Sequence, residues 1–364
     1  MLRTALIGFP SSGKTTLFQL MTSQPEAPKA GHGKLEAVVG VAKVPDVRVE
    51  RLAELYKPKK KTPATVEFAD MAGPGRTGAQ ALLDVAPYRT ADALVHVVRA
   101  FRDPSVTHHK DRIDPAADAQ GMEDELLLAD LAVVEKRVER LERDLKKGRT
   151  PELERERALI VRCKDALENG SPLRGLSLTD DERKMLRGFQ FLSAKPLLVV
   201  VNVDEADVAL LGDSAKAAET VGLTSFLSRA ATGVVAVCAK IELEIGQLDA
   251  ADAQAFLADL GLTEPGVNRV IRTTYDLLGY ISFLTAGEDE CRAWSIPRGT
   301  HAQLAASEIH SDIARGFIRA EVVRFEHLVA RGSVAACREH AEVRLEGKEY
   351  VVQDGDVINF RFAT

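Results

Sequence analysis

The residues best suited to chemistry lie near the start of the chain, in a glycine-rich segment that ends on a lysine and a threonine. This segment, Gly8-Phe9-Pro10-Ser11-Ser12-Gly13-Lys14-Thr15, has the spacing G-x-x-x-x-G-K-[ST]. It follows an apolar run at residues 4–7 and precedes a helical pattern that begins at Lys14. In that context the glycines let backbone N–H groups curl around an anion, and the start of the helix adds the positive end of its dipole. The sequence predicts a phosphate-binding loop, which we favour over a chance glycine-rich turn.

The polar side chains of this loop have distinct expected roles. Lys14 reaches the β- and γ-phosphate oxygens of a nucleotide and acts as the catalytic cation, and the Thr15 hydroxyl is a ligand for Mg²⁺. Backbone amides supply most of the remaining contacts. The expected nucleotide-binding residues of this segment are Gly8, Ser11, Ser12, Gly13, Lys14, Thr15 and Thr16.

A second phosphate-side element follows the apolar run at residues 66–68. Asp70-Met71-Ala72-Gly73 places a carboxylate after this strand pattern and a glycine three positions later. Ligands of open α/β sheets bind beyond the carboxyl ends of the strands. We therefore expect Asp70 to serve Mg²⁺, and Gly73 to meet the γ-phosphate as the second catalytic group. The alternative is that Asp70 only caps a helix or forms a turn.

The segment expected to read the base follows an apolar run at residues 197–201. Asn202-Val203-Asp204-Glu205 stands where GTP-binding relatives of this fold carry N-K-x-D, whose aspartate accepts hydrogen bonds from guanine N1–H and the 2-amino group. Glu205 occupies the aspartate position and adenine has no 2-amino group, so ATP is favoured over GTP. Cys238 and Ala239 follow the next strand pattern and are expected at the base, with Ala239 offering its backbone N–H. The alternative is that the two acidic residues only start a helix.

The pattern of apolar runs predicts the elements that position these residues. Through the first hundred residues, short apolar runs alternate with helical patterns, which is typical of a doubly wound parallel α/β sheet. Apolar residues then recur at spacings of three and four over residues 131–145 and again over 153–167, with Gly148-Arg149-Thr150-Pro151 between them. Since strand patterns return at residues 197–201 and 234–238, these two segments predict an antiparallel helical hairpin inserted into the sheet domain.

The pattern of apolar residues changes again near residue 280. Short apolar runs separated by Gly and Asp predict a small β-rich domain, with strands at residues 279–285, 292–296, 317–323, 350–352 and 357–362. The expected division is therefore residues 1–122 with 191–279 for nucleotide binding, 123–190 for the helical hairpin, and 280–364 for the terminal domain.

Composition narrows the class of protein. The 364 residues carry 48 Lys and Arg against 54 Asp and Glu, so no overall positive field draws the chain to nucleic acid or anionic lipid. The four cysteines are far apart and form no C-x-x-C, which favours reduced thiols over disulfides or a zinc site. The chain starts without a signal-peptide pattern, and no apolar run approaches bilayer length. We expect a cytoplasmic protein with neither a membrane nor a DNA partner.

Two further sets of residues are read as surface features. A local basic cluster could meet ribosomal RNA phosphate, although a solvated charged face is favoured; it consists of Lys57, Lys59, Lys60 and Lys61. His32, His108 and His109 lack carboxylates at ligand spacing and are read as loop residues.

The chain resembles the YchF-type Obg-like ATPases, which are translation-factor-class P-loop proteins. Beyond the phosphate loop and residues 202–205, the resemblance is carried by residues 44–46, 57–60, 63–68, 266–272, 285–287, 292–297, 316–321 and 354–357. It spans nearly the whole chain, and the C-terminal strings are very specific. The resemblance implies a P-loop domain, an inserted coiled-coil hairpin and a C-terminal TGS-like β-grasp domain. It also implies slow ATP hydrolysis, with ATP favoured over GTP through the N-x-x-E segment, and association with the ribosome.

Three departures from the family pattern surround the γ-phosphate and indicate a divergent member. Ser11 stands where the family has Asn, a position that bears on assistance by a monovalent cation. Lys34 falls near the family's switch threonine, so one metal ligand differs. The loop at residues 74–78 is shorter than its family counterpart. Nucleotide binding rests on the phosphate loop, whereas turnover depends on these altered segments.

Together, the residues and the resemblance predict a Mg²⁺-dependent ATP-binding switch protein with slow phosphoanhydride hydrolysis, associated with the ribosome or ribosomal RNA. Two alternatives remain open. One is a GTPase of the same fold. The other is a ribosome- or RNA-associated binding module whose nucleotide site is inert.

Overall fold

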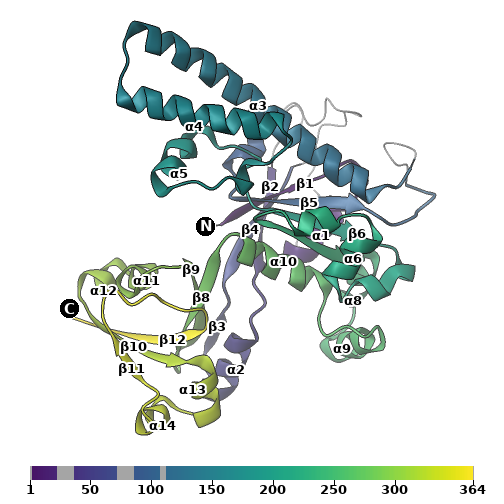
Figure 1. Cartoon of the computed structure of the whole chain (residues 1–364). Coiled ribbons are helices and arrows are strands. Elements are labelled where there is room, and N and C mark those ends of the chain that lie inside the picture. Colours follow the sequence, from purple (N-terminus) through teal and green to yellow (C-terminus); the bar gives the residue numbers. More distant parts are fainter. Residues whose placement is uncertain (1, 23–36, 72–85, 107–111, 364) are drawn as a thin grey trace. The chain divides into compact units, whose positions relative to one another are not determined.

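The chain forms two units in the computed structural model, which describes residues 2–22, 37–71, 86–106 and 112–363 (Figure 1). Unit 1 comprises Met1–Val41 and Glu67–Leu277, and unit 2 comprises Ala42–Val66 and Leu278–Thr364. The division expected from the sequence stays a prediction. It differs from the two units in two respects: residues 42–66 group with the C-terminal residues, and the hairpin at residues 123–190 groups with the nucleotide-binding part.

A six-stranded sheet forms the centre of unit 1, in the order β2-β4-β1-β5-β6-β7. Its strands are β1 (Arg3–Ile7), β2 (Ala37–Lys43), β4 (Thr65–Met71), β5 (Ala93–Arg99), β6 (Leu197–Asn202) and β7 (Thr232–Val237). Neighbouring strands from β4 to β7 are parallel, and every residue of β5 and β6 is buried. Helices cover both faces of such a sheet, which is why these strands read as continuous apolar runs. The predicted doubly wound α/β fold is confirmed.

The strand register brings the functional positions to one edge. Leu6 pairs with Asp70, and Arg99 pairs with Asn202, which in turn pairs with Val237. The strands are parallel, so their carboxyl ends meet at the same edge of the sheet. The segments after β1, β4, β5, β6 and β7 are therefore neighbours, although they are up to 230 residues apart in the sequence.

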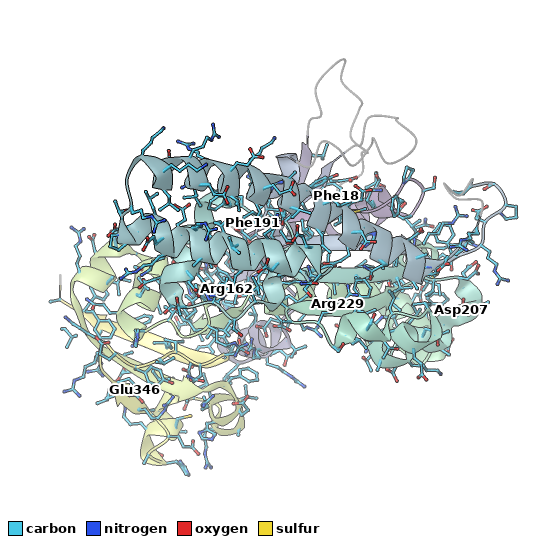
Figure 2. The ribbon with its side chains drawn as sticks, turned by 45° about the horizontal axis from the view of Figure 1, so that its top comes forward. Phe18, Arg162, Phe191, Asp207, Arg229 and Glu346 are labelled. Atoms are coloured by element: carbon cyan, nitrogen blue, oxygen red, sulfur yellow. The ribbon has the colours of Figure 1, made fainter. Side chains whose placement is uncertain are left out.

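Helices and short 3₁₀ turns complete unit 1. The helices are α1 (Lys14–Thr22), α3 (Pro115–Lys147), α4 (Pro151–Glu168), α5 (Asp180–Leu186), α6 (Ser214–Thr220), α7 (Thr224–Leu227), α8 (Ala239–Ile245), α9 (Ala250–Asp259) and α10 (Gly266–Leu277). The 3₁₀ turns are η2 (Ala86–Thr90), η3 (Leu173–Gly175), η4 (Arg187–Phe189) and η5 (Glu205–Leu210). Phe18 on α1, labelled in Figure 2, is fully buried and helps to anchor the helix that follows the phosphate loop.

The helical hairpin of α3 and α4 follows the predicted seam. Val134 and Leu141 on α3 are fully buried in one cluster with Ile160 and Cys163 on α4. Thr150 caps α4 by accepting a hydrogen bond from the Leu153 N–H, and Pro151 occupies the first turn, where its missing N–H costs nothing. Packing of this apolar stripe, rather than helix propensity alone, holds the two helices together.

Unit 2 contains a second six-stranded sheet, in the order β11-β10-β12-β8-β9-β3. Its strands are β3 (Lys60–Thr62), β8 (Tyr280–Ala286), β9 (Glu290–Pro297), β10 (Phe317–Arg324), β11 (Arg344–Glu346) and β12 (Asp356–Phe362). Its helices are α2 (Val47–Tyr56), α11 (Ala302–Ile309), α12 (Ser311–Arg315), α13 (Phe325–Arg331) and α14 (Val334–Glu339). The predicted strand at residues 350–352 is wrong. Only Val351 forms a bridge, to His301, and the Tyr350 N–H is used in a turn, where it donates to the Gly347 carbonyl oxygen.

The lysine cluster of the sequence forms the edge of this second sheet. β3 pairs in parallel with β9, and its register places Lys60 opposite Glu290. Lys59, Lys60 and Lys61 form ion pairs with Asp289, Glu290 and Glu50, with nitrogen–oxygen distances of 2.8, 3.4 and 2.5 Å. These pairs support the interpretation of the cluster as a charged protein surface, because three of its four lysines already have carboxylate partners.

Two properties of the described residues bear on the class of protein. Within the described part of the chain, no helix is both long enough and apolar enough to cross a membrane. Cys163, Cys238, Cys291 and Cys337 are all buried, and none is in a disulfide.

Candidate nucleotide-binding site

The loop between β1 and α1 requires glycine at two positions. Gly8 has φ 146° and Gly13 has φ 95°, which side-chain-bearing residues rarely adopt. A Cβ atom on Gly8 would lie 2.5 Å from the Val97 carbonyl oxygen, and one on Gly13 would lie 2.4 Å from the Asn202 side-chain nitrogen. Ser11 also has a positive φ of 61° and is exposed. The loop can therefore pass close to neighbouring strands with its amides left to bind a ligand.

The ammonium of Lys14 is hydrogen-bonded to the backbone of the loop itself. Its Nζ donates hydrogen bonds to the carbonyl oxygens of Gly8 and Phe9, both at 2.8 Å. Burial lowers the Lys14 pKa to about 8, and the charge of Asp70 partly opposes that shift. The ammonium is thus held by neutral acceptors inside the loop and lies within the electrostatic reach of a carboxylate.

Asp70 and Thr15 form the part of the site suited to a metal ion. Asp70 is 1% exposed, and burial raises its pKa, while a hydrogen bond from the Thr15 hydroxyl and the charge of Lys14 act in the opposite direction. The buried Asp70 Oδ2 has no hydrogen-bond partner among the described residues. A carboxylate with an unsatisfied oxygen beside a hydroxyl matches the hard oxygen ligands that Mg²⁺ prefers. The residues present fit this ion.

No larger cage of metal ligands accompanies them. The described residues contain no group of three or more His, Cys, Asp or Glu that could hold a metal ion. Mg²⁺ in nucleotide sites usually takes one or two protein oxygens and completes its shell with phosphate and water. Asp70 and Thr15 are sufficient for that arrangement.

Asn202 connects the phosphate loop to the loop after β7. Its side-chain nitrogen donates to the Ser12 carbonyl oxygen at 3.1 Å, and its Oδ1 accepts the Ala239 N–H at 3.1 Å. The expectation that the Ala239 N–H is free for the base is therefore wrong, because Asn202 already accepts it. Asn202 retains one N–H and one lone pair. Its main role in this geometry is to fix two loops at the sheet edge.

A cavity of about 440 Å³ opens beside this link, in the size range of small-ligand sites. Its walls come from the phosphate loop with α1, the segment after β5, and the segments after β6 and β7; they include Gly13, Thr16, Phe101, Glu205, Cys238 and Ala239. The Glu205 carboxylate forms an ion pair with Lys240 at 2.5 Å, which raises the Lys240 pKa. Burial raises the pKa of the Cys238 thiol, so this residue serves as an apolar wall.

Phe101 lines the cavity and Arg99 supports its loop from behind, and neither residue was expected from the sequence. Arg99 is 3% exposed and donates to the carbonyl oxygens of Phe101, Asp103 and Val106 at 3.0–3.2 Å. Its guanidinium also lies 4.5 Å from the centre of the Phe101 ring. Arg99 thereby shapes the loop that presents an aromatic ring to the cavity. The available signal was an arginine that ends an apolar strand pattern, two positions before a phenylalanine.

His96 packs behind the loop and was also missed. It is fully buried on β5, opposite Ile7, and burial with the charge of Lys14 lowers its pKa to about 3. Neither ring nitrogen has a partner in the part of the chain that the structure describes. A neutral imidazole here fills space under Gly8 and adds no charge near the phosphates.

The structure brings together most residues that the sequence singled out. Gly8, Gly13, Lys14, Thr15 and Asp70 surround one position, and Ser12 is buried beside them with its hydroxyl unpartnered among the described residues. Thr16, Asn202, Glu205, Cys238 and Ala239 line the adjoining cavity. Gly73, Lys34 and residues 74–78 lie outside the described residues, and so do His32, His108 and His109.

Known proteins resemble this chain over its whole length. A family model, YchF-GTPase_C, described as "Protein of unknown function (DUF933)", matches residues 280–363. A Bacillus subtilis (strain 168) protein named "Ribosome-binding ATPase YchF" is 40% identical over 367 residues, which cover 99% of each chain. An Escherichia coli O157:H7 protein of the same name is 36% identical over 368 residues, again 99% of each.

A solved structure agrees with these sequence matches. It is described as "Structure of the Schizosaccharomyces pombe YchF GTPase" and superposes with a TM-score of 0.84 at 29% identity, covering 99% of this chain and 97% of that one. A match of this extent supports the fold of both units.

The lowered Lys14 pKa predicts a pH-dependent affinity for a triphosphate. A bound phosphate raises the pKa of a nearby ammonium, so binding above pH 8 must take up a proton and becomes weaker as pH rises. Between pH 7 and pH 9 we expect the affinity for ATP to fall by about tenfold. Calorimetric titration at pH 7, 8 and 9 measures this change. In Lys14→Arg the guanidinium does not titrate, so the affinity should be flat; an equal slope in both proteins contradicts the assignment.

Proposed function

Because the chain belongs to the YchF family, we propose that it is a cytoplasmic, Mg²⁺-dependent ATP-binding switch protein that hydrolyses ATP slowly and associates with the ribosome. Two bacterial relatives carry names that state ribosome binding and ATPase activity, and the fission-yeast structure is described as a GTPase. The convergence of Lys14, Thr15 and Asp70 at the end of the sheet is the single observation that carries the proposal.

The proposed roles follow from the chemistry of each group. Amides of the phosphate loop and the Lys14 ammonium hold the β- and γ-phosphates, and Thr15 and Asp70 hold Mg²⁺. Mg²⁺, when bound, neutralises charge on the phosphate oxygens. Gly73 is proposed to donate its amide to the γ-phosphate. Asn202 keeps the loops in place, and the cavity lined by Phe101 and Glu205 takes the base.

Slow turnover agrees with the side chains available. The described groups nearest the phosphate position are a lysine, a carboxylate suited to a metal and a neutral buried histidine. None is an effective general base for a water molecule at the γ-phosphate. Catalysis would then rest on positioning and charge stabilisation, which is the general logic of phosphoryl transfer.

Two other functions differ from this one in nucleotide preference or in hydrolysis. A GTPase of the same fold is favoured by the description of the fission-yeast structure, whereas Glu205 in place of aspartate favours adenine. An inert, ribosome-associated binding module would keep nucleotide affinity and lose hydrolysis.

Single-turnover hydrolysis of ATP with and without ribosomes tests the proposed function. We expect a slow rate that needs Mg²⁺ and rises when ribosomes are added. Thr15→Ala removes the hydroxyl beside Asp70 and should lower the rate at least tenfold, because one metal ligand is lost. Thr220→Ala, an exposed threonine on α6, is the matched control and should leave the rate unchanged. Tight ATP binding with no hydrolysis under either condition supports the inert module instead.

Glu205→Asp is expected to move nucleotide preference towards GTP. A shorter carboxylate at this position can accept from the guanine N1–H and 2-amino group, and it loses the ion pair with Lys240. We expect the ratio of ATP to GTP affinity to fall about tenfold, or ~1.4 kcal/mol. Asp207→Asn, on exposed η5 outside the cavity and labelled in Figure 2, is the control. Equal affinities for ATP and GTP in the unaltered protein would count against the base assignment.

A further inference from the structure

Unit 1 contains another cavity at the opposite edge of its sheet, which we call the amino-edge pocket. It is lined by residues 89–92 before β5, residues 194–196 before β6, Ala231 before β7, and parts of the segment 173–191, and its volume is about 530 Å³. β5 spans seven residues, so this pocket lies roughly 20 Å from the carboxyl edge that carries the nucleotide site. The two cavities share no lining residue, so both can be occupied at once.

The floor of the amino-edge pocket is apolar. Leu173 and Phe191 are 1% and 3% exposed, and Leu176 and Leu178 are half-buried beside them. Phe191 is labelled in Figure 2, and its ring stacks on Phe189 with ring centres 5.2 Å apart. A floor of this kind takes up the apolar body of a ligand.

Two arginines of the pocket wall are already paired with carboxylates within the protein. Arg174 forms a bidentate pair with Glu123 at 2.7 and 2.8 Å, and both side chains are 1% exposed. Arg89 pairs with Asp130 at 3.1 Å, and Asp130 also accepts the backbone N–H groups of Leu192 and Ser193. These pairs fix α3 to the segments that build the wall.

Lys195 differs from these arginines because its hydrogen-bond partners are neutral. Its Nζ donates to the carbonyl oxygens of Arg89 and Ala91, and burial lowers its pKa. An ammonium has three donors, so one N–H remains for a ligand or water. Asp92 is the one carboxylate among the described lining residues, and it accepts the Arg3 backbone N–H at 2.9 Å.

Arg183 and Arg187 face the pocket without internal partners. Both are exposed, and they are four positions apart, on α5 and at the start of η4, so they lie on one face. Neither side chain has an ion-pair or hydrogen-bond partner among the described residues. Of the three acidic residues on α5, Asp181 pairs with Lys184 and Glu182 pairs with Arg162, and Asp180 forms no ion pair with a described residue. An anion bound between these two guanidinium groups would offset their mutual repulsion.

We propose that the amino-edge pocket binds a small organic anion, whose apolar body packs on the leucine and phenylalanine floor and whose phosphate or carboxylate lies between Arg183, Arg187 and Lys195. Guanidinium groups bind both kinds of anion with paired N–H donors. The lining residues include more cations than carboxylates, which attracts an anion, and the volume of the pocket suits a ligand of metabolite size.

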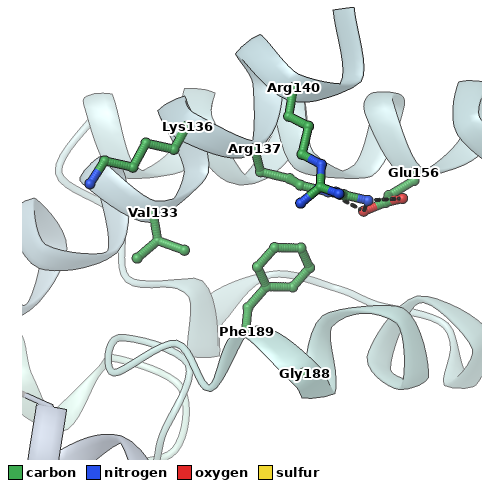
Figure 3. Close-up of a pocket in the computed structure, with 7 residues that line it drawn as sticks. All are labelled: Val133, Lys136, Arg137, Arg140, Glu156, Gly188 and Phe189. Carbon is green, nitrogen blue, oxygen red and sulfur yellow. Dashed lines mark hydrogen bonds and ion pairs between the residues drawn. The ribbon is translucent and has the colours of Figure 1, made fainter. Parts of the chain in front are cut away.

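A neighbouring cavity of about 490 Å³ is less suited to binding an anion. It lies between α3, α4 and η4 on the other side of the phenylalanine stack, and Figure 3 shows its lining with Phe189 beneath Arg137 and Arg140. Arg137 donates to both oxygens of Glu156 at 2.7 Å, which neutralises the central cation. Its other cations, Lys136 and Arg140, are exposed, whereas the amino-edge pocket adds the half-buried Lys195 and an apolar floor.

Calorimetric titration with defined small anions tests the proposal. The full chain is first saturated with ADP and Mg²⁺ and then titrated with phenyl phosphate, benzoate and the neutral benzyl alcohol. We expect one equivalent of phenyl phosphate or benzoate to bind and benzyl alcohol not to bind. The tighter of the two anions tells an organic phosphate from an organic carboxylate. Failure of both anions to bind overturns the proposal.

Matched double variants locate the binding. R183A/R187A should weaken the tighter anion at least tenfold. R143A/R155A removes two exposed arginines from α3 and α4, with the same change in charge, and should alter affinity less than twofold. Equal losses in the two double variants would show non-specific electrostatics and overturn the proposal. Equal unfolding midpoints of the two variants exclude misfolding as the cause of a loss.

Discussion

The close approach of the Asn202 carboxamide to Gly13 is the constraint on which the nucleotide site depends. A Cβ atom at position 13 would lie 2.4 Å from the carboxamide nitrogen, which donates to the Ser12 carbonyl oxygen, so the phosphate loop takes this path with glycine at position 13. The same side chain accepts the Ala239 N–H, which sets the far wall of the base cavity. One short side chain thus joins the segments after β1, β6 and β7, and the parallel register of the strands brings all three within its reach.

Burial gives this site its electrostatic character. Burial lowers the pKa of Lys14 and raises that of Asp70, because lost solvation destabilises the charged form of each group. The attraction between the two opposite charges offsets part of this effect. A bound triphosphate would stabilise the charged form of Lys14, and a divalent cation would stabilise the charged form of Asp70, because each group then has a partner of opposite charge. His96 stays neutral between them and the core, and leaves the balance between lysine and carboxylate undisturbed.

The parts of the fold that could be predicted are those specified by local sequence. The phosphate loop follows from spacing alone, and the sheet and hairpin follow from apolar periodicity, as the buried seam through Val134 and Ile160 confirms. β3 could not be found in this way. It has three residues, two of them lysines, and its partner strand begins near residue 290, so its pairing depends on a distant segment rather than on its own pattern. Phe101, which lines the cavity, and Arg99, which holds its loop, were missed for a similar reason, because carbonyl groups of an irregular loop satisfy the buried arginine.

The most direct test of the central claim is a calorimetric titration of ATP, with Mg²⁺ present, into the unaltered protein and into Lys14→Ala. The account predicts that the variant loses at least a hundredfold in affinity, since the loop then lacks the one cation that it directs at the phosphates. Lys216→Ala, an exposed lysine on α6, should bind ATP as the unaltered protein does. Unchanged affinity in Lys14→Ala would contradict the account.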